Sequence, residues 1–216
     1  DFVAKNTDLP FLIRLDTLQP LRPEDVIKDY KSPVLKSMTL VKKGEKPPAV
    51  AMQRGQFVAE AMMGDFRPYM IWDSKKGLTT VTRDDFGPEF IKKGFQPDLK
   101  ASKKVKLLDG KEVAVRTAFS LTEEYLNKSM TPKQVSSITG TPVKAIISLA
   151  EQIAKNPEKT TFVTGMGPNQ FFNSDLKDRA IFLVAALYRN IGFAGGNLAS
   201  YAGNYRMALF GGVTMY

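Results

Sequence analysis

Cysteine and histidine are both absent from the 216-residue sequence, and tryptophan occurs once. The lack of cysteine and histidine excludes disulfides, the usual zinc and iron–sulfur centres and every Ser-His or Cys-His dyad within the chain. Most hydrolytic chemistry is thereby removed. A site in this chain must act through backbone groups, amides, hydroxyls or charge.

The sequence also lacks a charged-then-apolar leader and an apolar run of membrane-spanning length. It opens at Asp1 without an initiator methionine and closes at Tyr216 without a polar tail. We therefore expect an internal fragment of a larger protein. Because a leader would lie upstream, the compartment stays open.

The overall composition permits a buried core. The residues are 43% hydrophobic and 25% charged, enough for one sizeable domain or two small ones. Lysine and arginine number 31 against 22 acidic residues, which gives a net charge of +9. This excess favours an anionic partner, although lysines spread over solvated faces produce the same balance.

The first part of the chain has the pattern of short, irregular elements. Apolar residues 11–15 predict a short strand, and Pro23 predicts the first turn of a short helix. Residues 36–48, rich in lysine, glycine and proline, predict a loop. Residues 50–63 predict a helical stretch.

Two hairpins are predicted next. The first joins strands at residues 67–73 and 79–82 across a turn that ends in glycine. The second joins strands at residues 105–108 and 112–119 through Asp109-Gly110. We expect a type I′ turn there, because Asp-Gly supplies the positive φ that this turn needs.

Beyond residue 119 the apolar period changes from two to between three and four. Ser120 and Glu123 form a capping box that predicts a helix start. A second helix is predicted from Thr131-Pro132 to Gly140, and a third begins after Thr141-Pro142. The third helix has one apolar face, which we expect to pack against a sheet or another helix. The residues on that face are Val143, Ile146, Ile147, Ala150 and Ile153.

The last part predicts an α/β unit. Residues 160–164 predict a strand, and residues 176–188 predict a long apolar helix after a glycine loop. Helix, strand, glycine loop and helix make half of an α/β unit, which requires a parallel neighbour strand. The change of pattern near Phe119 divides the chain into a hairpin-rich connecting region, 1–119, and an α/β region, 120–216. The predicted fold class is α/β.

The glycine loop after the predicted strand is the first candidate site. Gly165 and Gly167 allow backbone to approach a ligand closely, and the following segment can aim N–H groups at an anion. The side-chain amides of Asn169 and Gln170 both donate and accept hydrogen bonds, as the edges of heterocycles require. This pattern is typical of a nucleotide-phosphate or pterin site. A plain turn is the alternative interpretation.

A second run of small and polar residues follows from Gly192 to Arg206. Small, hydroxyl and amide side chains in a helix-free stretch suit a surface on which a planar polar ligand lies. The candidate residues are Ser200, Tyr201, Ala202, Gly203, Asn204 and Tyr205. A glycine-rich loop without a ligand is the alternative.

Other charged groups have simpler interpretations. Asp84-Asp85 and Glu123-Glu124 could be general acid/base pairs, but we expect turn residues in the first pair and a helix cap at Glu123. Lysines between residues 92 and 106 could form a nucleic-acid stripe. Few aromatic residues interleave them, so we expect a solvated loop.

Three stretches resemble a known family, the dimethyl sulfoxide reductase superfamily, whose molybdenum enzymes carry two molybdopterin guanine dinucleotides. Residues 131–150, with Thr131-Pro132, Ile138-Thr139-Gly140 and Pro142, resemble its helix pair. Residues 165–170 resemble the loop that contacts the cofactor. Residues 195–206 resemble the glycine-rich segment near the molybdenum.

Within the superfamily, residues 7–13, 69–73 and 200–206 are similar to alpha subunits of nitrate reductase, nitrite oxidoreductase and perchlorate, chlorate and selenate reductases. Residues 200–206 look most like nitrite oxidoreductase. By the resemblance, Gln170 takes the place of a pterin-contacting histidine of respiratory nitrate reductase. Ala202 and Gly203 stand where formate dehydrogenases carry an arginine, which favours an oxyanion over formate.

The resemblance implies a fragment of a multi-domain molybdenum oxidoreductase, with a Rossmann-like cofactor-binding half-domain at 120–216. The implied reaction transfers an oxygen atom between an oxyanion and water, as nitrite oxidation or nitrate reduction. The implied cofactor is Mo-bis(molybdopterin guanine dinucleotide). Its contacts would be Gly165, Gly167, Asn169, Gln170, Ser200, Tyr201, Ala202, Gly203, Asn204 and Tyr205.

The resemblance also implies what lies elsewhere. The metal-ligating residue and the ligands of a 4Fe-4S cluster are expected upstream, so this chain would hold no catalytic or metal-ligating residue and be inactive alone. Expected partners are an oxyanion substrate, an iron–sulfur beta subunit and a membrane or haem gamma subunit, with no nucleic acid. The choice of oxyanion, the direction of the reaction and the side of the membrane stay open.

A second function class stays open from the residues themselves. A non-catalytic, basic α/β module could bind a nucleotide or nucleic acid through the glycine loop and its lysines. Such binding would weaken steeply as ionic strength rises.

Overall fold

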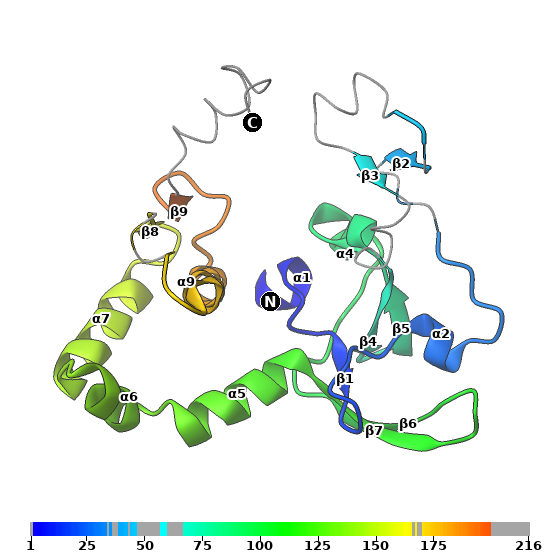
Figure 1. The fold of residues 1–216 in the computed structure, drawn as a ribbon, viewed down its shortest axis with the longest axis horizontal. Coiled ribbons are helices and arrows are strands. Elements are labelled where there is room, and N and C mark those ends of the chain that lie inside the picture. Colours follow the sequence, from blue (N-terminus) through cyan, green and yellow to red (C-terminus); the bar gives the residue numbers. More distant parts are fainter. Residues whose placement is uncertain are drawn as a thin grey trace. The chain divides into compact units, whose positions relative to one another are not determined.

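The computed structural model describes residues 2–33, 35, 39–42, 44–46, 57–59, 67–165, 167 and 170–199. Contacts divide the chain into two compact units, Val3–Ser129 and Met130–Tyr216. Both contain helices and strands, so the α/β fold class is confirmed (Figure 1). The predicted change of pattern near residue 119 falls inside the first unit, and the domain assignment stays a prediction.

The chain order of the main elements begins with those before residue 130: α1 (Phe2–Asn6), β1 (Leu12–Arg14), α2 (Pro23–Val26), β2 (Thr39–Val41), β3 (Phe57–Ala59), β4 (Tyr69–Asp73), β5 (Gly77–Val81), the 3₁₀ turn η2 (Arg83–Asp85), α4 (Pro88–Lys92), β6 (Ser102–Lys106), β7 (Glu112–Thr117) and α5 (Ala118–Ser129). After residue 130 follow α6 (Pro132–Thr139), α7 (Val143–Lys155), β8 (Thr161–Val163), α9 (Ser174–Leu187) and β9 (Asn197–Ala199).

The first unit is organised around an antiparallel sheet of order β1-β7-β6. Along β7, Val113, Val115 and Thr117 are buried while Glu112 and Ala114 are exposed. This alternation gives the sheet one apolar face, as the period of two in a half-buried strand requires. The core on that face contains Leu12, Leu21, Met70, Ala101, Val105, Leu107, Val113 and Val115.

A second core lies beside the β4–β5 hairpin and consists largely of aromatic rings. Phe90 from α4 is fully buried, with its ring centroid 5.5 Å from that of Phe86 and 5.0 Å from that of Phe95. Phe11 stacks on Tyr69 with centroids 4.0 Å apart, which ties β1 to β4. Large buried rings in contact dominate the packing energy of a small core, so this cluster fixes the hairpin.

Several predictions for the first unit are confirmed. A strand forms in residues 11–15, a short helix begins at Pro23, and both hairpins form between antiparallel strands. In the first hairpin, Asp73 pairs with Gly77 directly across the turn.

The predicted loop at 36–48 is wrong at residues 39–41, which form a strand, but is confirmed at residues 42 and 44–46, and the predicted helix at 50–63 is wrong where the structure describes it. β2 lies within the first range and β3 within the second, and the two pair in parallel with Thr39 opposite Phe57. Their extended conformation depends on a partner distant in sequence, which local patterns do not reveal. The other residues of 50–63, and part of 36–48, lie outside the described residues.

The second hairpin has a different turn from the predicted one. Gly110 has a φ of 88°, but Asp109 does not have a positive φ, so the type I′ prediction is wrong. The Gly110 N–H instead donates to the Leu107 carbonyl at 3.0 Å, and the Leu107 N–H donates to the Lys111 carbonyl at 2.8 Å. The result is a three-residue hairpin loop in which glycine takes the left-handed position.

The predicted capping box at Ser120 is also wrong, because α5 already begins at Ala118. The hydroxyl of Thr117 accepts the Ser120 N–H at 3.1 Å and so satisfies a free donor of the first turn. Ser120 is buried within the helix, and Glu123 contacts Lys100 instead, with 3.0 Å between Oε1 and Nζ.

In the second unit the helix pair is confirmed. The Thr131 hydroxyl accepts the Gln134 N–H at 3.4 Å, and Gly140 ends α6 with a φ of 73°. α7 forms as predicted and contacts α6. Its apolar face is only partly covered within the described chain, since Val143, Ile146 and Ile153 are half-buried while Ile147 and Ala150 are exposed.

The predicted α/β unit is confirmed as well. β8 and β9 pair in parallel and α9 lies between them in sequence, which makes a β-α-β crossover. Within the part of the chain that the structure describes, no helix is long and apolar enough to cross a membrane.

Candidate functional site

The carboxyl ends of β8 and β9 define the candidate site. The two strands run in parallel with Thr161 opposite Asn197 and Val163 opposite Ala199. By sequence, Gly165 follows one strand end and Ser200 follows the other. The carboxyl ends of neighbouring parallel strands are where open α/β sheets bind their ligands. The register therefore brings the strand ends that precede both predicted segments to one edge of the sheet.

The space around the first segment is open. A Cβ added at Gly165 or Gly167 would meet no atom of the described residues within 4 Å, and neither glycine has a φ in the left-handed region. Neither crowding nor backbone conformation within the described chain therefore requires glycine at these positions. The backbone at both glycines is accessible to a group that lies against it.

The other predicted site residues are only partly described. Gln170 is exposed, and its N–H donates to the Gly167 carbonyl at 3.3 Å, which curves the chain after the loop. Asn169 and the six residues Ser200, Tyr201, Ala202, Gly203, Asn204 and Tyr205 lie outside the described residues. Their predicted contacts stay predictions.

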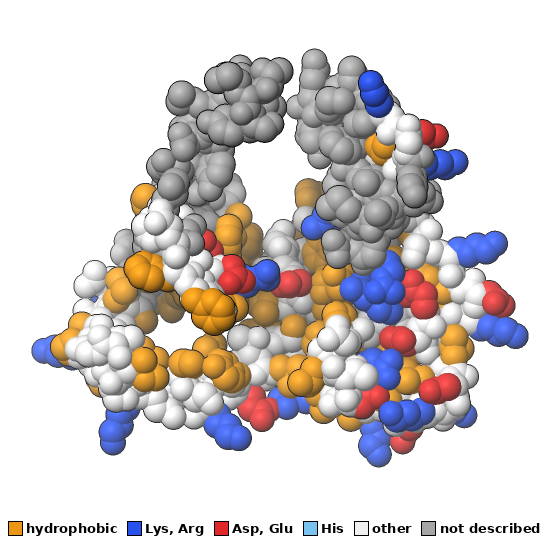
Figure 2. Space-filling view, in the orientation of Figure 1, with side chains coloured by type: hydrophobic (Ala, Val, Ile, Leu, Met, Phe, Trp, Pro, Cys, Tyr) orange, Lys and Arg blue, Asp and Glu red, His pale blue; other side chains and the backbone are white. Residues whose placement is uncertain are grey.

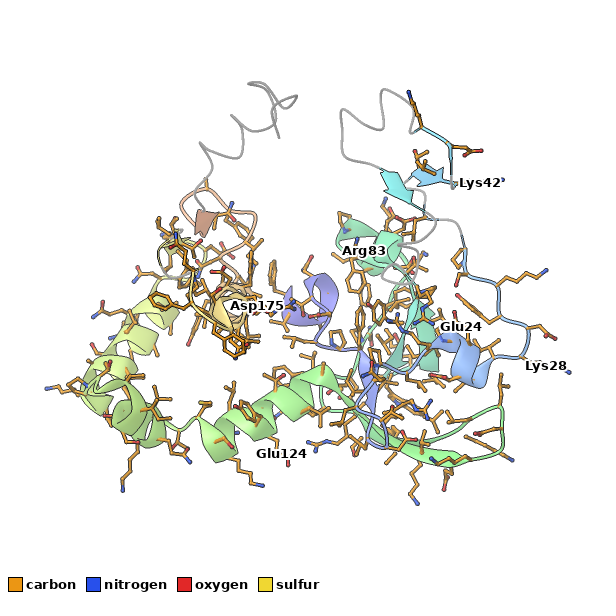
Figure 3. All side chains as sticks on the ribbon, viewed as in Figure 1. Glu24, Lys28, Lys42, Arg83, Glu124 and Asp175 are labelled. Atoms are coloured by element: carbon orange, nitrogen blue, oxygen red, sulfur yellow. The ribbon has the colours of Figure 1, made fainter. Side chains whose placement is uncertain are left out.

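The helix after the loop differs from a phosphate-binding helix. α9 begins at Ser174, several residues beyond Gly167, and its first turn carries Asp175 (Figure 3). The Asp175 carboxylate lies 3.5 Å from the Arg179 guanidinium, and it already complements the helix dipole. A bound anion would therefore be held by the loop itself rather than by the amino terminus of α9.

Two aromatic residues beside the loop were not predicted as site residues. Phe171 is 74% exposed and Phe172 is 95% exposed. The two adjacent rings form an apolar surface that another group can cover. The sequence signal was the Phe-Phe pair directly after Gln170, between the glycine loop and the predicted helix.

These residues fit an organic, phosphate-bearing cofactor better than a bare metal ion. The site offers open backbone at Gly165 and Gly167, the amide of Gln170 and two aromatic faces. Backbone N–H groups and amides bind heterocycle edges and phosphates. Among the described residues, no group of three or more histidine, cysteine, aspartate or glutamate side chains could hold a metal.

The acidic pairs have structural roles. Asp85 is buried, accepts the Thr82 N–H at 2.6 Å and pairs with the Lys93 ammonium. In the second pair, a hydrogen bond from Arg116 lowers the pKa of Glu124, whereas a general acid needs a raised one. The turn interpretation of Asp85 is confirmed.

The lysines from residue 92 to 106 do not form one stripe. Lys92 pairs with Glu89, Lys93 with Asp85, Lys100 with Glu123 and Lys104 with Glu112. Lys103 lies over the ring of Trp72, 5.1 Å from its centroid. On the face shown in Figure 2, basic side chains stand at separate places with acidic ones among them. This distribution is that of a solvated surface.

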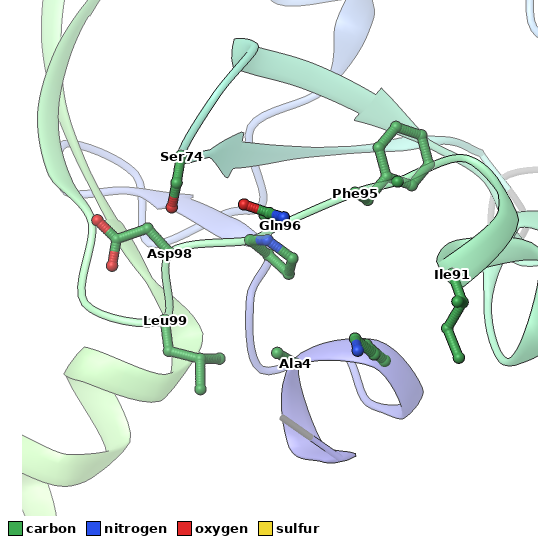
Figure 4. Close-up of a pocket in the computed structure, with 10 residues that line it drawn as sticks. Ala4, Ser74, Ile91, Phe95, Gln96, Asp98 and Leu99 are labelled. Carbon is green, nitrogen blue, oxygen red and sulfur yellow. The ribbon is translucent and has the colours of Figure 1, made fainter.

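A cavity of about 660 Å³ lies in the first unit (Figure 4). It opens between α1 and the segment after α4, and its polar groups come from Lys5, Ser74, Gln96 and Asp98. The backbone there is already paired, since the Ser74 N–H donates to the Gln96 carbonyl at 2.8 Å. None of the residues predicted as site residues lines this cavity.

No protein-family model matches the sequence. The chain is 29% identical, over an alignment of 225 residues, to the perchlorate reductase subunit alpha of Dechloromonas aromatica (strain RCB), covering 98% of this chain and 21% of that protein. It is 26% identical to the respiratory nitrate reductase subunit alpha of Haloferax mediterranei, covering 97% of this chain and 19% of that protein.

A third relative is similar over less of the chain. Dimethyl sulfoxide reductase DmsA of Escherichia coli (strain K12) is 36% identical over 91 residues, which are 42% of this chain and 11% of that protein. This chain thus spans about a fifth or less of the length of these relatives. The three relatives are reductases of one superfamily, and two of them align with almost the whole chain. The chain is therefore a homologue of reductases of the dimethyl sulfoxide reductase superfamily of molybdopterin oxidoreductases, and the resemblance stated from its sequence is confirmed.

Proposed function

We propose that the full-length protein is the catalytic subunit of a molybdenum oxidoreductase that transfers an oxygen atom between an oxyanion and water. The substrate pair is nitrite and nitrate, and this chain supplies part of the cradle for Mo-bis(molybdopterin guanine dinucleotide). One observation supports the proposal: the parallel register of β8 and β9 sets Val163 opposite Ala199, so the strand ends that precede the two predicted cofactor segments lie at one sheet edge.

The proposed cofactor supplies the redox chemistry, in which one oxygen atom and two electrons are exchanged with the oxyanion. The residues of this chain bind and orient it. Open backbone at Gly165 and Gly167 allows close approach, and the Gln170 amide offers both a donor and an acceptor. The segment from Ser200 to Tyr205 forms a wall of the substrate approach.

Charge and the relatives support the anionic partners. The net charge of +9 raises the local concentration of a phosphate-bearing cofactor and of an oxyanion. Perchlorate and nitrate, in the names of two relatives, are oxyanions. Similarity of residues 200–206 to nitrite oxidoreductase is the reason for choosing the nitrite and nitrate pair.

The proposal includes partners for the full-length protein. Two of the relatives are named as alpha subunits, which implies complexes of several subunits. Electrons would pass through a 4Fe-4S cluster of the same subunit to an iron–sulfur beta subunit, and a haem or membrane gamma subunit would complete the complex.

The test uses the complete subunit. Gly167→Leu and Gly203→Leu would each place bulk where the cofactor lies, so bound molybdenum and turnover should fall by about tenfold or more. Ala154→Leu adds similar bulk at an exposed position of α7 and should leave both unchanged. Normal metal content and normal turnover in both glycine variants would refute the placement of the cradle.

A further inference from the structure

A small group of residues outside the candidate site holds the amino ends of β8 and β9 together. We call Asn190, Gly196 and Thr161 the strand-start cluster. Asn190 follows α9, Gly196 precedes β9, and Thr161 is the first residue of β8. The cluster lies at the opposite end of both strands from the candidate site.

Asn190 is fully buried and holds the start of β8. Its Oδ1 accepts the Thr160 N–H at 3.0 Å, while its own N–H donates to the Ala185 carbonyl at 2.8 Å. Its Nδ2 has no hydrogen-bond partner among the described residues. A buried amide whose NH₂ group is unpaired costs stability, so the bond that its Oδ1 accepts from Thr160, directly before β8, is the interaction that favours an asparagine here.

Gly196, directly before β9, packs closely against the backbone of Glu158 and Asn190. A Cβ at this position would lie 2.7 Å from the Glu158 carbonyl oxygen and 2.9 Å from the Asn190 carbonyl oxygen. Both neighbours are backbone atoms, so a side chain at 196 would displace the start of β9. The Thr161 hydroxyl adds a third link by donating to the Gly195 carbonyl at 3.0 Å.

These links matter because the strands are short. β8 and β9 have three residues each, so their own ladder contributes few hydrogen bonds to hold the register. A slip of one residue would move one strand by about 3.3 Å along the other and turn its side chains to the opposite face. The segments that follow Val163 and Ala199 would then be displaced relative to each other. A displacement of roughly 1 Å in an active site can lower turnover about a hundredfold, and this one would be larger.

We propose that the strand-start cluster is a positioning device for the cofactor cradle, because it fixes the register of β8 against β9 and thereby the alignment of Val163 with Ala199, the strand ends that precede the two cradle segments. The inference rests on the proposed function. Asn190, Gly196 and Thr161 touch neither cofactor nor substrate in it. They act through the two strands.

The experiment compares variants of the full-length subunit. Asn190→Leu removes the acceptor at similar size, Gly196→Ala adds the Cβ, and Thr161→Val removes only the hydroxyl. Asn156→Leu is the matched control, because Asn156 is exposed and, among the described residues, its side chain donates only to the Gln152 carbonyl, at 2.8 Å. Three measurements are made: molybdenum per folded subunit, kcat and KM of the loaded molecules, and hydrogen exchange of residues 160–170.

A device that positions the cradle predicts changes that a loss of stability alone would not give. In Asn190→Leu and Gly196→Ala, molybdenum per folded subunit, or kcat of the loaded molecules at unchanged KM, should fall about tenfold or more. Exchange in residues 160–170 should rise, and the control should stay within twofold. Thr161→Val should show a smaller loss of the same kind, and it remains informative where the stronger variants do not fold.

The opposite results are equally clear. Molybdenum content, kcat and exchange within twofold of the parent in Asn190→Leu and Thr161→Val would overturn the inference while leaving the proposed function intact. A parent subunit that carries no molybdenum would refute the proposed function first, and the inference with it. A fall in the yield of folded protein at constant molybdenum per folded subunit would identify the cluster as structural only.

Discussion

The carboxylate of Asp73 accepts the backbone N–H of Gln96 at 2.6 Å and so joins the β4–β5 turn to the segment after α4. Its other oxygen accepts the N–H groups of Lys75 and Lys76 at 2.8 and 2.9 Å. Asp73 is fully buried, and three donors satisfy it. One side chain thus organises two loops of the first unit.

Asp73→Asn should destabilise the first unit by about 1–3 kcal/mol. The amide keeps an acceptor for Lys75 and Lys76 but turns a donor toward the Gln96 N–H, and a buried donor facing a donor is unsatisfied. Urea unfolding followed by Trp72 fluorescence reports the change, because Trp72 is the single tryptophan and lies in β4.

A matched control is Asp109→Asn. Asp109 is exposed and its Oδ1 accepts only the Lys111 N–H, at 2.9 Å, which the amide oxygen also accepts. Its stability should change by less than about 0.5 kcal/mol. Equal losses in the two variants would contradict the role given to Asp73.

Stability should depend on pH through the same carboxylate. Burial alone would raise the pKa of Asp73, but the N–H donors of Gln96, Lys76 and Lys75 together hold this pKa below its ordinary value of 3.8. In acid the unfolded chain then binds the proton more readily than the folded one. The stabilisation is present above 3.8 and is lost as the pH falls through the lower folded pKa.

The measurement is the urea midpoint of Trp72 fluorescence as a function of acidic pH, in the parent and in Asp73→Asn. The difference between the two should shrink as the pH falls, because the amide side chain of the variant does not titrate. A constant difference down to the lowest pH would argue against a lowered pKa.

Phe90→Ala should destabilise the first unit by about 3–5 kcal/mol. The Phe90 ring is fully buried between Phe86 and Phe95, so its removal leaves a cavity that the neighbouring rings fill poorly. Ile91→Ala, one position along the same helix, serves as the control because Ile91 is 64% exposed. Thermal unfolding of the two variants should differ clearly, and similar melting temperatures would disprove the packing argument.

Arg22→Lys should cost about 1–2 kcal/mol although the charge is kept. The Arg22 guanidinium lies 3.9 Å from the Tyr69 ring centroid and donates through Nη1 to the Arg67 and Pro68 carbonyls, each at 3.0 Å. An ammonium cannot stack on the ring as a plane. Lys28→Ala on the exposed surface after α2 is the control, with little change expected in urea unfolding.

Thr131→Ala should weaken α6 by about 1 kcal/mol. The Thr131 hydroxyl accepts the Gln134 N–H, and the Gln134 Oε1 accepts the Thr131 N–H at 3.0 Å. Without this reciprocal pair, amides of the first turn should exchange faster with solvent. Lys133→Ala in the same turn should leave the exchange of these amides unchanged, since the cap is kept. Faster exchange in both variants would show that the cap is not the cause.

Elements defined by neighbours in sequence were predictable from the sequence. Thr131-Pro132 and Gly140 bound α6 as predicted, because a cap and a left-handed glycine act within a few residues. The α/β order and the need for a parallel partner of β8 were also predicted. The β2–β3 pair was missed, because its two strands stabilise each other across a long stretch of chain.

The candidate site shows the same division. The glycine loop, the amides and the second polar segment were visible as motifs, and the resemblance to the superfamily came in part from the same residues. The exposure of Phe171 and Phe172 was not visible, since an apolar pair in a sequence is more often buried than exposed. The contacts of Asn190 with Thr160 and of Gly196 with Glu158 were equally hidden, because each joins residues that are far apart in the sequence.

The sequence by itself indicated the resemblance to the superfamily, set the net positive charge and excluded thiol and imidazole chemistry, because these depend on which residues are present. The tertiary structure decided which strand ends meet, that most of the described lysines between residues 92 and 106 pair with carboxylates, and that Asp73 and Asn190 are buried. Those outcomes depend on contacts between residues far apart in the chain, whose free energies exist only once the backbone has folded.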